Sequence, residues 1–266
     1  MKISKKGEYY GKQEKVLAQN GFLLSEYDYL DSGTPWHFHE NPYFMFVLNG
    51  DMLDINKKST TLCPAGSLVF HNWQDQHLNT RESDLARGFH IELDREWYKN
   101  KQLDFNLWEG SRLIKNPKLY HVLAKLYYEF KNNDAYSPLA IELLLLKLCE
   151  GIEKENLVKT KHEPLWVKDL RELLNENDES LSLTGLSKEL GVHPVHLSRS
   201  IPKYLTTNLG GYLRQQKLKK AIPYILNKKY SLTEVAYLSG FADQSHFTRT
   251  FKKTFFMTPK GFRSKL

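Results

Sequence analysis

The chain has 266 residues, of which 41% are hydrophobic and 13% aromatic, a composition typical of globular rather than disordered proteins. This length favours two domains, each able to bury its own core. The first residues are charged and lack the apolar stretch of a secretory signal. The longest apolar run, Leu139 to Cys149, includes Glu142 and Lys147 and is shorter than the roughly 18–20 residues that span a bilayer. We therefore expect a cytoplasmic protein without a membrane span.

Charge is distributed unevenly along the chain. Residues 181–266 hold fifteen Lys and Arg against three acidic residues, a net charge of +12, which leaves −5 for the preceding residues out of the total of +7. A basic module of this kind favours a polyanionic partner, with nucleic acid ahead of an anionic membrane.

Residues 20–95 alternate short runs of aromatic and β-branched residues with turn signals. The run Tyr43 to Leu48 has the composition of a strand and is followed by Asn49-Gly50, a dipeptide typical of hairpin turns. Several short strands at this spacing predict a small barrel or sandwich. The two cysteines, Cys63 and Cys149, have no metal-type spacing and are interpreted as small core residues.

A helical period begins near Leu119, and Ser137-Pro138 has the composition of a second helix start. The second helix is apolar on most of its surface, which favours burial within the domain or a subunit interface. We expect helices over about 113–155, a domain spanning 1–155, a polar linker at 156–164 and a second domain at 165–266.

The basic module contains an internal repeat. Residues 197–201 (LSRSI) match residues 247–251 (FTRTF) at an offset of 50, and residues 208–212 match residues 258–262 at the same offset. Each copy has the pattern of a helix, a glycine-containing turn and a second helix, which predicts two helix-turn-helix units at about 181–205 and 231–256.

The second copy shows the clearest helix signals. Ser231 and Glu234 have the spacing of a capping box, and Asp243 is expected to cap the following helix. Phe247 and Phe251 then fall on one face of that helix at helical spacing, with Phe255 a turn further on.

The opposite face is polar and suits base recognition, because Gln and Arg can pair with adenine and guanine edges while Ser and Thr fit polar edges or the thymine methyl group. The expected base readers of the second unit are Gln244, Ser245, Thr248 and Arg249. The corresponding face of the first unit, with less hydrogen-bonding capacity, consists of Val195, Ser198 and Arg199. Contacts to the DNA backbone are expected from Lys252, Lys253, Lys260 and Arg263.

Residues 240–255 (GFADQSHFTRTFKKTF) and 258–263 (TPKGFR) carry a specific resemblance to the DNA-binding domain of the AraC/XylS family of bacterial transcription regulators. The resemblance covers roughly 165–266. It implies two helix-turn-helix units joined by a long helix, here about Leu209 to Asn227, with the same base-reading residues. Two departures stand out. Pro202 lies in the first recognition helix and Pro223 in the connecting helix, where an interior proline kinks or ends a helix.

Residues 36–50 and 64–77 resemble the two cupin motifs, which form a small β-barrel that often serves as the sensing part of such regulators. The candidate effector pocket comprises Trp36, His37, His39, Tyr43 and His77. Three of these are histidines and could bind a transition metal. However, Tyr43 occupies the position of the acidic ligand and Glu40 is out of register with it, so we expect no metal and no cofactor.

The predicted fold class is therefore α+β multidomain, with a cupin-like barrel, flanking helices and an all-α double helix-turn-helix domain. The favoured function is sequence-specific binding of double-stranded DNA by a non-enzymatic transcription regulator. The resemblance implies a homodimer, a small-molecule effector and contact with RNA polymerase. Two alternatives stay open: a metal-dependent cupin enzyme with a nucleic-acid-binding appendage, and a nucleoid protein without sequence preference, whose affinity would depend on salt alone.

Overall fold

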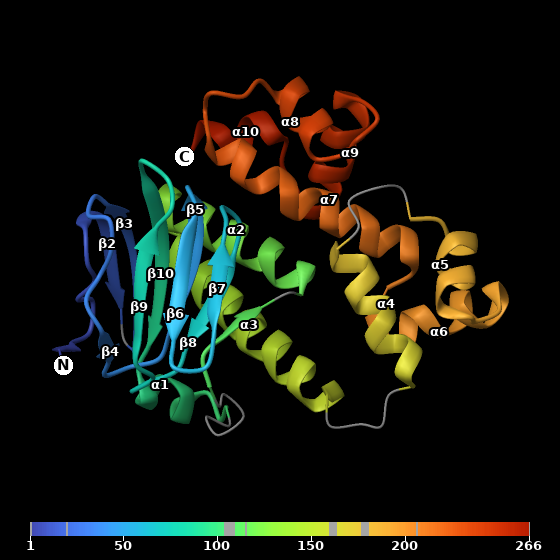
Figure 1. The fold of residues 1–266 in the computed structure, drawn as a ribbon. Coiled ribbons are helices and arrows are strands. Elements are labelled where there is room, and N and C mark those ends of the chain that lie inside the picture. The colour runs from blue at the N-terminus through green and yellow to red at the C-terminus, as the bar shows by residue number, and fades with distance from the viewer. Residues whose placement is uncertain are drawn as a thin grey trace.

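The computed structural model describes residues 2–19, 21–103, 110–114, 116–159, 164–176, 181–205 and 207–265. It has a sheet-rich N-terminal half and a helical C-terminal half (Figure 1), which confirms the predicted α+β class. The strands are β1 (Lys2–Ser4), β2 (Lys12–Gln19), β3 (Phe22–Tyr29), β4 (His37–His39), β5 (Tyr43–Asn49), β6 (Met52–Asn56), β7 (Thr60–Cys63), β8 (Leu68–His71), β9 (His77–Arg81), β10 (Ala86–Leu93) and β11 (Arg112–Ile114). The helices are α1 (Arg95–Asn100), α2 (Pro117–Asn132), α3 (Ser137–Lys159), α4 (Leu165–Glu176), α5 (Leu183–Leu190), α6 (Pro194–Leu205), α7 (Leu209–Leu226), α8 (Leu232–Leu238), α9 (Gln244–Phe255) and α10 (Pro259–Ser264).

The described strands form two sheets. One has the order β1-β4-β9-β6-β7 and the other the order β11-β8-β5-β10-β3-β2. Strands β1 and β2 precede residue 20, so the sheets begin earlier in the chain than the predicted range of 20–95.

Alternation of side chains gives the six-stranded sheet two different faces. The face turned toward the helices is aromatic and fully buried, with Phe44, Phe70 and Phe89 in the cluster that also contains the core of α2. The opposite face, turned toward the five-stranded sheet, contributes Tyr43, Met45 and Val69 to a separate cluster. This second face carries His71 and His90, whereas the buried histidines of β4 and β9 belong to the five-stranded sheet opposite.

The turn Asn49-Gly50 does not form a hairpin, so that prediction was wrong. Gly50 has a φ of 77°, as the dipeptide suggests, but β5 pairs with β8 and β10 whereas β6 pairs with β7 and β9. The turn therefore carries the chain from one sheet to the other. The dipeptide encodes the local backbone conformation and not the partner of each strand.

Helices α2 and α3 pack against each other and cover the outer face of the six-stranded sheet (Figure 1). Helix α3 extends to Lys159, four residues into the predicted linker at 156–164, and residues 160–163 lie outside the described residues. Within the described part of the chain, no helix is both long and apolar enough to cross a bilayer.

The C-terminal helices form two groups joined by α7 (Figure 1). The first group, α4 to α6, has its own hydrophobic cluster. The second group, α8 to α10, belongs to the same cluster as the sheet and α2. Both unexpected prolines are accommodated near helix ends, because α6 and α7 each continue for three residues beyond Pro202 and Pro223.

Candidate functional site

Helix α9 separates a buried face from an exposed face, as its sequence predicts. Asp243 caps it by accepting a hydrogen bond of 2.6 Å from the backbone N–H of His246. Phe247 and Phe251 are completely buried and Phe255 is 2% exposed. These contacts anchor the helix to the protein and leave its polar face free for a ligand.

The polar face of α9 carries the four predicted base readers. Gln244, Ser245 and Arg249 are exposed, and Thr248 is half-buried. The Thr233 hydroxyl of α8 donates a 2.7 Å hydrogen bond to the Gln244 carbonyl oxygen. That oxygen has a second lone pair and the amide nitrogen keeps both of its donors, so Gln244 is held in orientation without losing its capacity to pair with a base.

Helix α6 presents the equivalent face of the first unit. Val195, Ser198 and Arg199 are all exposed, while Leu197 and Ile201 are buried against α4 and α5. Ser182 caps α5, with its hydroxyl accepting from the Gly185 N–H at 3.0 Å. Both predicted helix-turn-helix units thus place their predicted base readers on accessible helix faces.

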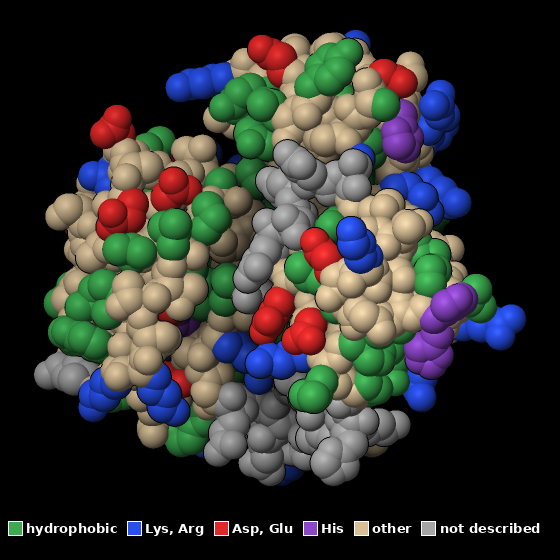
Figure 2. All heavy atoms as spheres, turned by 45° about the vertical axis from the view of Figure 1, so that its right-hand side comes forward, with side chains coloured by type: hydrophobic (Ala, Val, Ile, Leu, Met, Phe, Trp, Pro, Cys, Tyr) green, Lys and Arg blue, Asp and Glu red, His purple; other side chains and the backbone are tan. Residues whose placement is uncertain are grey.

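The predicted phosphate-binding residues differ in their surroundings. Lys252, Lys253 and Lys260 are exposed, and basic side chains project from the part of the molecule that carries the helical units (Figure 2). The Arg263 guanidinium instead donates to the carbonyl oxygens of Ile225 at 3.1 Å and Tyr230 at 2.7 Å. Arg263 therefore ties α10 to the end of α7 in this structure.

A second candidate site lies between the two sheets. Among the described residues, one group of three possible metal ligands has its donor atoms within 4.8 Å of one another, namely His37, His39 and His77. The register of β4 and β9 places His37 directly opposite His77, and His39 lies two residues along on the same face of β4. All three side chains are buried, with at most 2% exposed.

Hydrogen bonds define which nitrogen carries the proton in two of these rings. Nδ1 of His37 donates to the Pro35 carbonyl oxygen at 2.9 Å, and Nδ1 of His77 donates to the Asp75 carbonyl oxygen at 3.0 Å. Nε2 of each ring therefore keeps its lone pair. Neither nitrogen of His39 has a hydrogen-bond partner in the structure. Burial, reinforced for His39 and His77 by the neighbouring imidazoles, lowers the pKa of all three histidines and favours their neutral form.

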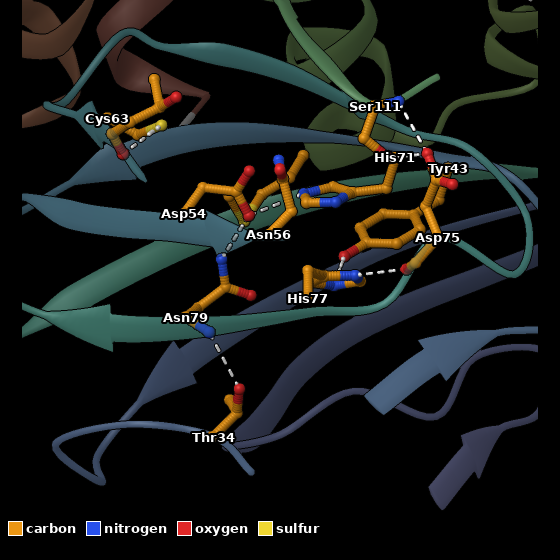
Figure 3. A network of polar contacts seen from close by, with 12 residues as sticks. Thr34, Tyr43, Asp54, Asn56, Cys63, His71, Asp75, His77, Asn79 and Ser111 are labelled. Carbon is orange, nitrogen blue, oxygen red and sulfur yellow. Dashed lines mark hydrogen bonds and ion pairs between the residues drawn. The ribbon is translucent and has the colours of Figure 1, made fainter. Parts of the chain in front are cut away.

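Further polar groups lie close to His77 (Figure 3). The Tyr43 hydroxyl donates to Nε2 of His77 at 3.0 Å, and the Tyr43 ring stacks on His71 with centroids 4.6 Å apart. Burial lowers the pKa of His71 to about 3. Nε2 of His71 lies 3.7 Å from a carboxylate oxygen of Asp54, which also accepts from Asn79 at 3.0 Å.

The remaining predicted pocket residue and the alternative acid lie elsewhere. Trp36 is 40% exposed. Glu40 is exposed and its carboxylate accepts from the Lys6 N–H at 2.8 Å. Neutral imidazoles and the rings of Tyr9 and Tyr43 therefore lie close to His39.

A helix-turn-helix domain model matches residues 186–265. The probable transcription factor PqrA of Proteus vulgaris is 32% identical over 88 residues, which cover 33% of this chain and 72% of that protein. The chain belongs to the AraC/XylS family of DNA-binding transcription regulators. An uncharacterised helix-turn-helix regulator of Staphylococcus aureus is 21% identical over 236 residues, or 82% of this chain. This AraC/XylS regulator spans only 31% of that longer relative.

Solved structures similar to this AraC/XylS regulator include an apo form of ToxT from Vibrio cholerae, with 16% identity, a TM-score of 0.42, and coverage of 92% of this chain and 98% of that one. The C-terminal domain of AraT from Geobacillus stearothermophilus has 25% identity and a TM-score of 0.36, with coverage of 40% and 89% respectively.

Sequence reasoning missed two buried histidines of the regulator's barrel. His71 lies at the end of β8 and His90 lies in β10, where its Nε2 is 2.6 Å from the Tyr29 hydroxyl. His90 lies outside the motifs at 36–50 and 64–77. His71 lies within the second motif, but not at a ligand position. Their alternation with Phe70, Phe89 and Ile91 gives the only sequence signal, because it indicates which face of the strand they occupy.

Proposed function

We propose that this protein is a sequence-specific DNA-binding regulator whose C-terminal domain, about 165–266, reads DNA with two recognition helices. The observation that carries the proposal is the polar face of α9, which stays exposed while Phe247 and Phe251 fix the opposite face in the core. The equivalent arrangement in α6 supports a second reading element. Such exposed faces suit insertion into successive major-groove segments of one duplex.

Each polar residue of α9 has a distinct proposed role. Arg249 would donate two hydrogen bonds to guanine, and Gln244 would pair with adenine while Thr233 keeps its amide in place. Lys252, Lys253 and Lys260 would bind phosphate, which positions the protein without reading the sequence. Because Arg263 is engaged by main-chain carbonyl oxygens, the proposed phosphate contacts rest on the lysines.

The first experiment maps the bound sites across the genome and then measures affinity for one such site and for a random duplex. Arg249→Ala is expected to remove roughly 1–3 kcal/mol of discrimination. Lys253→Ala should weaken binding to both duplexes equally and reduce the salt slope by about 1. Equal losses on both duplexes for Arg249→Ala would contradict base reading. A wild-type protein indifferent to sequence would support the nucleoid alternative.

The N-terminal domain, about 1–155, is proposed to control this DNA binding as a sensor and not to act as an enzyme, since the similar sequences are regulators. The proposed effector site comprises the barrel residues His37, His39, Tyr43 and His77. Occupancy would alter how the DNA-binding units sit on DNA, and thereby operator occupancy or contact with RNA polymerase in the cytoplasm.

A homodimer is proposed to form through the outer face of α3. Tyr136, Leu139 and Leu143 are 82%, 75% and 51% exposed, and the two leucines are four residues apart on one face of the helix. Leu139→Lys should shift sedimentation from dimer to monomer. Leu62→Lys, at a position on β7 that is 56% exposed, serves as the control and should leave the mass unchanged.

A further inference from the structure

The buried histidines of the barrel leave lone pairs without partners. His39 has two buried nitrogens and no hydrogen bond, and His37 keeps a free Nε2 because its Nδ1 donates to Pro35. An unsatisfied buried polar atom costs about 1–3 kcal/mol. Within the three-histidine group the two buried nitrogens of His39 are such atoms, and they are the observation that points to a ligand at this site.

The chemistry of the cluster identifies the class of ligand. Neutral imidazole nitrogens are good ligands for zinc, copper, iron and nickel, whereas magnesium and calcium prefer oxygen. Hydrogen bonds from Nδ1 of His37 and His77 to main-chain carbonyl oxygens leave Nε2 as the nitrogen with a lone pair in each ring, the arrangement that supports metal-bound histidines. The Asp54 carboxylate, 4% exposed and beside His71, supplies negative charge nearby.

The space inside the barrel suits an ion better than an organic molecule. The rings of His37 and His77 are 4.4 Å apart between centroids, those of His71 and His77 are 4.2 Å apart, and Tyr9 stacks on His90 at 3.9 Å. An organic ligand of drug size needs roughly 300–1,000 Å³. A groove of about 580 Å³ lies beside Phe38 and Trp73, but none of the three histidines lines it.

Tyr43 is the group that distinguishes this cluster from a preformed metal site. Its hydroxyl occupies the lone pair of His77 Nε2, so an ion can use that nitrogen only after the hydrogen bond breaks. Tetrahedral ligation with Zn–N distances of about 2.0–2.1 Å also requires the donor atoms to approach to roughly 3.3 Å. The present separations reach 4.8 Å, so binding would draw β4 and β9 together.

We propose that His37, His39 and His77 bind one divalent transition-metal ion, with zinc as the simplest case, and that the ion displaces Tyr43 from His77 and acts as the effector. The effector role rests on the proposed regulatory function. The binding site itself does not, since it is defined by the histidines alone.

The test uses untagged full-length protein stripped with a chelator, titrated with Zn²⁺ by calorimetry and with Co²⁺ by visible absorption. One ion per chain is expected. His39→Ala should weaken binding by more than about 100-fold, because loss of a supporting residue outside the ligand set already costs 10–100-fold. His121→Asn, which replaces a buried histidine of α2, is the matched control and should keep the wild-type affinity.

Tyr43→Phe separates displacement from ligation. Removing one competing hydrogen bond should tighten Zn²⁺ binding about 5-fold, whereas a loss of affinity would overturn the displacement role. Circular dichroism establishes that each variant is folded. Absence of a bound ion in the wild type, or unchanged affinity in folded His39→Ala, would overturn the metal site.

Affinity for the mapped DNA site, measured with and without Zn²⁺, tests the effector role separately. A change of at least about 5-fold, which corresponds to 1 kcal/mol, that disappears in His39→Ala is the expected result. Unchanged DNA affinity with a bound ion would overturn the effector role and leave the regulator intact. Failure of any specific DNA binding would count against the proposed function, while the ion titration would still decide the site.

Discussion

The two helix-turn-helix units have the same local design but different surroundings. The first unit packs on α4, in a cluster that includes Leu170, Leu197 and Ile201 and excludes the barrel. The second unit shares one continuous cluster with the six-stranded sheet and α2. A repeated sequence motif has thus produced one unit with a core of its own and one unit whose core is continuous with that of the N-terminal domain.

The connection between barrel and second unit consists of specific contacts. The ring of His121 on α2 lies 5.6 Å from that of Phe255 on α9, and Tyr128 stacks on Phe262 at 5.4 Å. A side-chain carbon added to Gly66 in the turn between β7 and β8 would lie 2.9 Å from Pro223 of α7. The second unit is therefore in direct contact with the N-terminal domain, whereas the cluster of the first unit excludes the barrel.

The largest expected effect comes from removing a core side chain in each unit. Phe251→Ala deletes a fully buried ring and should lower the free energy of unfolding by about 3–5 kcal/mol. Ile201→Ala should lower it by about 2–5 kcal/mol. Hydrogen exchange should show reduced protection of α2 and the adjacent strands for Phe251→Ala, and of α4 to α6 alone for Ile201→Ala. The same exchange pattern in both variants would contradict the conclusion that the first unit has a separate core and the second shares the core of the N-terminal domain.

Base discrimination should also differ between the units. Arg249→Ala is expected to reduce the free energy of discrimination at one base pair by roughly 1–3 kcal/mol. Arg199→Ala should lose less, because the neighbouring Val195 and Ser198 offer fewer hydrogen bonds than Gln244 and Thr248. Competition assays with single-base variants of the mapped operator measure both. A larger loss for Arg199→Ala would reverse the ranking of the two helices.

The helical half of the fold could be predicted from the sequence because its signals are local. The capping box of Ser231 and Glu234, the cap at Asp243 and the buried face of Phe247 and Phe251 all occur as the spacing indicates. Each of these depends on residues within one or two helical turns. Pro202 and Pro223 were harder to interpret, since their effect depends on how soon each helix ends.

The barrel and the contacts between domains could not be predicted to the same extent. Alternation shows which residues share a strand face but not which strands pair, so Asn49-Gly50 suggested a hairpin that does not form. His71 and His90 are distant from Tyr43 in sequence, and only the pairing of β8 and β10 with β5 brings them beside it. The packing of α2 against α7 and α9 left no pattern in the sequence at all.

Acid should weaken the contact between the barrel and the second unit. Burial lowers the pKa of His121 to about 4, and the nearby Lys125 acts in the same direction. The unfolded side chain has a pKa near 6.5, so it binds more protons than the folded one between these values. Stability is therefore fully present above about pH 6.5 and falls as the pH drops toward 4.

At pH 5.5 protonation of this histidine in the unfolded chain should lower the free energy of unfolding by roughly 1.2 kcal/mol relative to pH 7. Denaturant titrations of wild type and His121→Gln at both pH values isolate the effect, because the variant lacks the titrating ring. An equal loss of stability in the variant would show that other groups are responsible.

The smallest expected effect uses the matched caps of α5 and α8. Ser182→Ala and Ser231→Ala should each lower the free energy of unfolding or local opening by about 1 kcal/mol, because each removes the hydroxyl that accepts the cap hydrogen bond, from the Gly185 N–H at 3.0 Å and from the Glu234 N–H at 3.2 Å. Since α8 belongs to the barrel's cluster, Ser231→Ala should lower the midpoint of global unfolding. Ser182→Ala should instead increase local opening of α5 and α6, visible by hydrogen exchange and not in the global midpoint. If Ser182→Ala shifted the global midpoint by a similar amount, the first unit would unfold together with the N-terminal domain, and the two units would respond alike despite their separate cores.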